Sequence, residues 1–264
     1  EMTNTELARS VIDQLEAWVQ ELATPFLPPR TVQEQDGTYR LLFQNHSPHA
    51  VLVGKLVRAV SGSRAALVLA GMGYVAESAV ILRTISDFCG EVTAVAEAIR
   101  KDSPPAAVLT FVAQYFEPRA RTPEELAARE RAFYVSREEL MKAEVRLAQD
   151  AGVDAEQLRT LRRFLNMSLD AYVHGAYETT MELFNPHAGR FMLAGHESLE
   201  KRHDFVDAVV GKLHGVVSAA ELAAAVSGND TVFSEARRAR RALDSHEEAA
   251  VFNSEHQSID DRIV

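Results

Sequence analysis

The chain has 264 residues, of which 47% are hydrophobic and 25% are charged. This composition is typical of a soluble globular protein with a sizeable core, and it excludes intrinsic disorder and a disulfide-stapled miniprotein. The 28 basic and 38 acidic side chains give a formal net charge of -10, which opposes attraction to a phosphate backbone unless positive charge is locally concentrated. Cys89 is the single cysteine, so no intrachain disulfide forms and we expect a cytoplasmic protein.

The sequence predicts neither a secretory signal nor a membrane partner. Residues 1–30 lack a basic stretch followed by an apolar run. The closest approach to a membrane span, residues 65–82, contains Glu77 and two glycines, Gly71 and Gly73. We therefore expect two buried helices that meet at a turn around these glycines.

The hydrophobic period is helical along nearly the whole chain. Caps and breakers mark the helix ends, for example Ser47 before Pro48, and Asp154 after Gly152. The predicted helices cover approximately residues 5–23, 47–71, 74–100, 105–116, 122–151, 154–175, 197–226 and 231–250, and a longer helix over residues 154–183 is the alternative for the sixth.

The segments between the helices are short. Residues 28–36 are predicted to be a linker, and residues 37–45 alternate in polarity like a short strand or extended arm. Residues 185–189 are a predicted turn, and residues 251–264 a flexible tail. The sequence thus predicts an all-α fold, a bundle of about eight helices in one domain covering residues 1–264, with residues 1–36 as an N-terminal appendage.

Several common chemistries have no motif in this sequence. No glycine-rich phosphate loop follows a strand, no G-x-S-x-G nucleophile elbow occurs, and one cysteine cannot build a zinc ribbon. Three polar clusters on predicted helices remain as candidate sites, and we expect no cofactor.

The first cluster is centred on His174. Asp170 lies one helical turn before it, and the helical period places both residues and Arg163 opposite the apolar stripe of their helix. A carboxylate in that position can orient an imidazole that acts as a general acid or base. A solvated helix face that carries a histidine is the alternative interpretation.

The second cluster lies on the helix predicted over residues 74–100. Arg83 and Asp87 are one turn apart on the face away from the apolar stripe, while Glu77 falls at the edge of the apolar side. In the functional interpretation, Arg83 and His174 share a cleft in which the arginine holds a phosphate. In the structural interpretation, Arg83 and Asp87 form a surface pair and Glu77 a salt bridge.

The sequence LDAYVH at residues 169–174, with ESAVILRTISDF at residues 77–88, resembles two helices of the HEPN-related bacterial proteins. The matching positions are Glu77, Arg83, Asp87 and His174, and the resemblance covers residues 48–183. That superfamily of all-α bundles includes metal-independent ribonuclease toxins, abortive-infection proteins and non-catalytic relatives. Its ribonucleases place an arginine four to six residues before the catalytic histidine, whereas Arg163 here is eleven residues away, about 16 Å along a helix.

The third cluster consists of residues spaced i, i+4, i+7 and i+11 on one predicted helix face, namely His196, Glu200, His203 and Asp207. Two imidazoles and two carboxylates in this pattern can bind a divalent metal ion. The alternative is the solvated boundary of an amphipathic helix.

Basic side chains concentrate in two short segments, residues 159–163 and 237–241. If their helices adjoin, Arg163, Arg240 and Arg241 become candidate contacts for the phosphates of RNA or of a nucleotide. Arg240 and Arg241 also precede His246 by six and five residues. Solvated helix faces with interleaved acidic residues are the alternative.

Together, the sequence and the resemblance predict a HEPN-like cytoplasmic homodimer. The leading functional hypothesis is a toxin or antiviral-defence protein that cleaves or binds RNA, with His174 as acid/base, Asp170 orienting it and Arg83 holding phosphate. The alternative is a non-catalytic interaction module for dimerisation or for docking a protein partner. A metal-dependent helical-bundle enzyme is a third, more distant hypothesis.

Overall fold

A computed structural model of the chain describes residues 2–33, 37, 39–101, 106–117, 124, 142, 145 and 154–260. Only the backbone is described at 155, 157, 158, 161, 162, 165, 166 and 247–260. The helix predicted over residues 122–151 therefore lies almost entirely outside the described residues.

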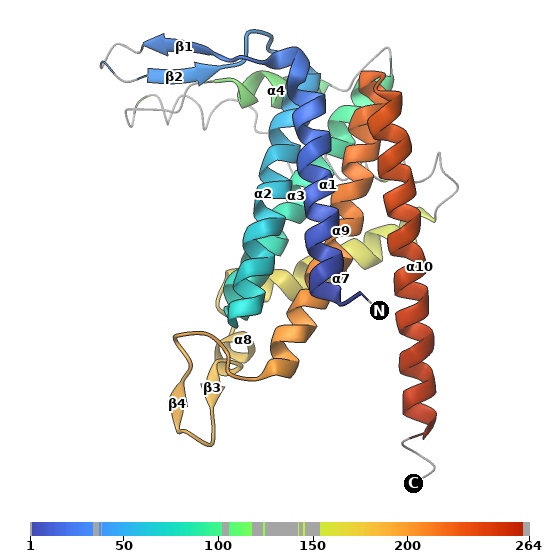
Figure 1. Ribbon diagram of the computed structural model, residues 1–264. Coiled ribbons are helices and arrows are strands. Elements are labelled where there is room, and N and C mark those ends of the chain that lie inside the picture. Colours follow the sequence, from blue (N-terminus) through green and yellow to red (C-terminus); the bar gives the residue numbers. More distant parts are fainter. Residues whose placement is uncertain are drawn as a thin grey trace.

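The described part of the chain is mainly helical, which confirms the predicted all-α class (Figure 1). Eight α-helices pack together in it: α1 (Asn4–Ala23), α2 (Pro48–Met72), α3 (Val75–Arg100), α4 (Ala106–Tyr115), α7 (Ala155–Val173), α8 (Tyr177–Met181), α9 (Leu199–Ser227) and α10 (Asp230–Asp260). A short 3-10 helix, Thr24–Phe26, follows α1.

Two small antiparallel hairpins interrupt the helices. The first joins β1 (Arg30–Gln33) to β2 (Tyr39–Leu42), with Thr31 opposite Leu41. The predicted strand is confirmed, whereas the predicted linker was wrong because Arg30–Gln33 within it pairs with that strand. The second hairpin joins β3 (Phe184–Asn185) to β4 (Arg190–Phe191) across the predicted turn.

Local capping explains where α2 begins and ends. The Ser47 hydroxyl accepts the Ala50 N–H at 3.3 Å, as the Ser-Pro pair predicts. At the other end, Gly73 has φ +88°, a conformation that favours glycine. A Cβ there would lie 2.5 Å from the carbonyl oxygen of His196, so glycine also lets the segment before α9 approach the α2–α3 turn.

The core lies between the long helices. α2, α3 and α9 pack against one another, α1 packs on α2 and α9, and α10 packs on α9. Ile12, Leu15 and Trp18 of α1 are buried in this core, so the N-terminal helix shares the core of the bundle. The Trp18 indole N–H also donates to Glu235 of α10 at 2.8 Å.

Among the described helices, α9 is the one that is long and apolar enough to cross a membrane. Half of its most apolar window is buried, and α9 contacts α1, α2, α3 and α10. A helix at the centre of a bundle needs the same composition, because it must be apolar on most of its circumference.

α7 runs across the direction of the long helices and packs on α3 (Figure 1). It ends at Val173, and Gly175 with φ +59° forms the turn into α8. The predicted helix end at His174-Gly175 is therefore confirmed, and the alternative continuation to Leu183 was wrong, because the glycine supports a chain reversal there. At the far end of the chain, the backbone of α10 stays helical to Asp260, beyond the predicted end at Ala250.

Candidate functional site

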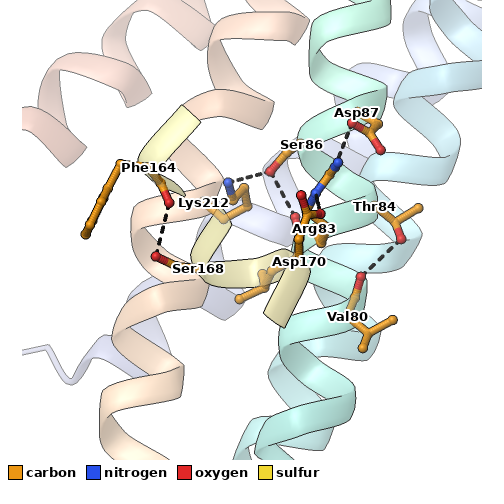
Figure 2. A network of polar contacts seen from close by, with 10 residues as sticks. Val80, Arg83, Thr84, Ser86, Asp87, Phe164, Ser168, Asp170 and Lys212 are labelled. Atoms are coloured by element: carbon orange, nitrogen blue, oxygen red, sulfur yellow. Dashed lines mark hydrogen bonds and ion pairs between the residues drawn. The ribbon is translucent and has the colours of Figure 1, made fainter. Parts of the chain in front are cut away.

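The guanidinium of Arg83 on α3 is a buried charged group that contacts two carboxylates (Figure 2). Its Nε donates to Asp170 of α7 at 2.6 Å, and its Nη1 lies 2.7 Å from Asp87, one turn further along α3. The Arg83 side chain is 8% exposed, whereas the two carboxylates are 43% and 40% exposed. Burial lowers the pKa of Arg83, but hydrogen bonds to Asp87 and Asp170 outweigh burial and raise this pKa overall.

This geometry corrects two expectations about α3. Arg83 was expected on an outward face, but it is buried because α7 covers that face. Its i, i+4 pair with Asp87 is confirmed. Glu77 was expected at the edge of the core, but it is exposed.

The polar layer continues to α9. Lys212 Nζ donates to the Ser86 hydroxyl at 2.7 Å, and that hydroxyl donates to the Leu82 carbonyl at 3.1 Å. Figure 2 shows these contacts beside the Arg83 network. Polar contacts from α3 therefore reach both α7 and α9.

His174 is not part of this network. It lies in the turn after α7, is exposed, and its backbone N–H donates to the Asp170 carbonyl at 3.0 Å. Within the described part of the chain, no side-chain hydrogen bond joins Asp170 to His174, and the Asp170 carboxylate instead accepts from Arg83. The structure thus brings Arg83 and Asp170 together and leaves the imidazole of His174 in solvent.

The outward face of α7 carries large apolar side chains. Phe164 is 60% exposed and Met167 is 63% exposed, and Figure 2 shows Phe164 directed away from the Arg83 network. Arg163 and His174, on the same side of the helical period, are exposed as well. The placement of Arg163 and His174 away from the bundle therefore agrees with the helical period, whereas Asp170 turns towards α3.

The inward face of α7 is fixed by aromatic and polar contacts. The Tyr172 ring meets Phe205 of α9 edge-on at 5.8 Å, and its hydroxyl donates to Glu182 at 2.8 Å. Burial and the bond to Glu182 raise the pKa of Tyr172, so the hydroxyl stays protonated. Leu169 packs against the core beside them.

The four residues proposed as metal ligands do not all share a helix face, because His196 lies outside α9 while Glu200, His203 and Asp207 belong to it. His196 precedes α9, and its Nδ1 accepts the N–H of Ser198, the residue that caps this helix. Asp207 accepts a hydrogen bond from Asn4 at 2.6 Å. The described residues contain no group of three histidine, cysteine, aspartate or glutamate side chains that could hold a metal ion. The shared face predicted for this cluster was wrong because the helix begins at Leu199.

The three arginines predicted to contact phosphate differ in whether their guanidinium groups already bind another side chain. Arg240 donates to Glu221 of α9 at 2.7 Å, whereas Arg163 and Arg241 are exposed. His246 is also engaged, with its Nε2 2.8 Å from the amide oxygen of Asn4. α7 packs on α3 while α10 packs on α9 and α1, so the two basic segments belong to differently placed helices.

A second charged cluster, missed by the sequence reasoning, lies where α4 meets α2 and α3. Lys55 of α2 and Glu91 of α3 form an ion pair at 2.6 Å, with side chains 14% and 19% exposed. Burial raises the pKa of Glu91 against the lowering effect of Lys55, and the nearby charge of Asp87 raises it further. The i, i+4 spacing of Asp87 and Glu91 places these two carboxylates on one face of α3, but no spacing in the sequence relates them to Lys55 on α2.

Comparisons with known proteins identify no relative. No protein-family model, no curated protein and no solved structure matches the chain. The assignment to the HEPN-related proteins therefore depends on the short motifs alone, and the structure supports the coarser statement that the protein is a mostly helical bundle.

Proposed function

We propose that this protein is a non-catalytic helical interaction module that pairs with a second copy of itself through the outward face of α7. The observation that carries the proposal is the exposure of Phe164 and Met167 on that face, at 60% and 63%. Aromatic residues, methionine and arginine are enriched at protein interfaces, and Arg163 stands beside this apolar pair.

A second copy is a fitting occupant because the same patch would be present on both partners. A two-fold contact of α7 with α7 buries both apolar pairs at once and leaves neither exposed, whereas a different partner would have to supply its own complementary surface. The inner side of α7 is attached to the bundle, because Asp170 accepts from Arg83 of α3 and the Tyr172 ring contacts Phe205 of α9. Little conformational order then has to be gained on binding.

The Arg83 geometry favours interaction over catalysis. The Arg83 guanidinium already contacts Asp170 at 2.6 Å and Asp87 at 2.7 Å, so a phosphate would have to compete with two carboxylates for this group. Asp170 is also occupied as an acceptor, so it is not available to orient His174. RNA cleavage remains the second candidate function because the imidazole of His174 is exposed and open to substrate.

Light scattering coupled to size exclusion tests the proposed function. The wild-type chain should be a dimer at micromolar concentration, and Phe164→Glu with Met167→Glu should give a folded monomer. Val68→Glu is a matched control, since Val68 is 54% exposed on α2, far along the chain from α7. A wild-type monomer, or a control that dissociates equally, would overturn the proposal. If the wild type cleaves single-stranded RNA and His174→Ala abolishes that cleavage, the second candidate function is established instead.

A further inference from the structure

The ammonium group of Lys55 is enclosed by aromatic rings. Its Nζ lies 5.4 Å from the ring centroid of Phe88, 5.2 Å from that of Phe111 and 5.4 Å from that of Tyr115. All three distances fall within the range of cation–π attraction. Because Glu91 contacts the same Nζ, the four residues Phe88, Phe111, Tyr115 and Glu91 form a cage around one lysine.

Two of the three rings belong to α4, which packs on α2 and α3 in the part of the chain that the structure describes. This helix has ten residues, and its fully buried side chains are Val108 and Val112. A helix of this length is marginal on its own and depends on packing. Phe111 and Tyr115, one turn apart, therefore supply a large share of what holds α4 on α2 and α3.

The backbone of α2 is shaped to receive Tyr115. A Cβ at Gly54 would lie 1.9 Å from the Tyr115 hydroxyl oxygen. Glycine at this position allows the ring to lie directly against α2, next to Lys55. The cage thus depends on a close approach that any larger residue at position 54 would block.

We propose that α4 is a latch, held shut over the Lys55–Glu91 pair by the attraction of its two rings to the lysine charge. The latch can open locally, because α4 contributes two buried valines to the core, whereas most of the buried core side chains belong to α1, α2, α3 and α9. Opening moves Phe111 and Tyr115 away and exposes a cation and a carboxylate between α2 and α3. The positive charge on Lys55 therefore determines the fraction of molecules in which α4 is open.

Hydrogen exchange of the full chain, read by mass spectrometry, tests the latch. Lys55→Met keeps the length of the side chain and removes its charge, so amides of residues 106–115 should exchange at least tenfold faster, with α9 unchanged. Lys212→Met is the matched control, because Lys212 is a lysine of α9 whose ammonium group donates to Ser86 of α3. It should leave exchange in α4 as in the wild type.

Changes at Tyr115 separate the contribution of the aromatic ring, which attracts the Lys55 cation, from the contribution of the hydroxyl. Tyr115→Phe keeps the ring and should exchange like the wild type, whereas Tyr115→Leu should open α4 as Lys55→Met does. Equal exchange in wild type and Lys55→Met would overturn the latch. So would an equal acceleration in every helix, which would show general destabilisation, or an effect of Tyr115→Phe as large as that of Tyr115→Leu.

Discussion

The guanidinium of Arg83 meets the carboxylate of Asp170 at 2.6 Å across a sequence separation of 87 residues. The first belongs to a long core helix, α3, and the second to the helix laid across it, α7. Because Asp87 occupies another side of the same guanidinium, the arginine is neutralised by the protein itself. Two residues that the sequence suggested as catalytic partners of His174 therefore act together as an attachment between helices.

Replacing Arg83 with methionine should lower the free energy of unfolding by about 2 kcal/mol. Breaking a buried ion pair typically costs about 3–5 kcal/mol, and the partial exposure of both carboxylates reduces this cost. Urea unfolding of Arg83→Met and of Asp170→Asn, together with the double variant, measures the coupling. If the loss of stability in the double variant equals the sum of the losses in the two single variants, the contact between Arg83 and Asp170 contributes nothing.

The helices could be predicted from the sequence because their signals are local. The Ser47 cap, the Asp154 side chain that accepts the Glu156 N–H at 2.7 Å, and the i, i+4 pair of Arg83 with Asp87 are all readable from spacing.

The partners between helices could not be predicted in the same way. The helical period shows which side of α3 is polar. It does not show that α7 covers that side and buries Arg83. The Lys55–Glu91 pair was missed for the same reason, since its members lie on different helices. For His196, an error of a few residues in the start of α9 was enough to remove it from the expected face.

His174→Ala should change the free energy of unfolding by less than about 0.5 kcal/mol, because the His174 side chain is exposed and alanine keeps the backbone N–H that bonds to the Asp170 carbonyl at the end of α7. Thermal unfolding of the purified variant checks this. Any RNA-cleaving activity of the wild type should vanish in the same variant if the imidazole transfers protons. A fall in melting temperature of about 8 °C would place the imidazole in a packed contact that the geometry does not show.

Treatment with a strong chelator should leave the melting temperature and the oligomeric state unchanged. His196 is engaged with Ser198, and Asp207 with Asn4, so the proposed ligands are directed to other partners. Elemental analysis of protein purified without added metal is the direct check. Stoichiometric zinc, manganese or iron would bring the metal-dependent hypothesis back.

Gly73→Ala should destabilise the bundle by about 2 kcal/mol or more. The residue has φ +88°, and the added Cβ would lie 2.5 Å from the His196 carbonyl oxygen, so backbone strain and a steric clash act together. Gly71→Ala is the matched control, because a Cβ there meets nothing within 4 Å. Chemical denaturation of both variants should separate them clearly, and equal stability would contradict the close approach of the two segments.

The stability of the wild type relative to Glu91→Gln should fall as pH rises from about 4 to 7. Burial raises the pKa of Glu91 above its usual value of 4.5, so the folded chain holds this proton more tightly than the unfolded chain does. Between the usual and the raised pKa, the unfolded chain releases the proton first, and the free energy of unfolding therefore decreases with pH. Glutamine does not titrate, so subtracting the variant isolates this effect from other groups. Urea unfolding at several pH values gives the difference, and a difference that rises with pH would show that the attraction of Lys55 outweighs the burial of the carboxylate.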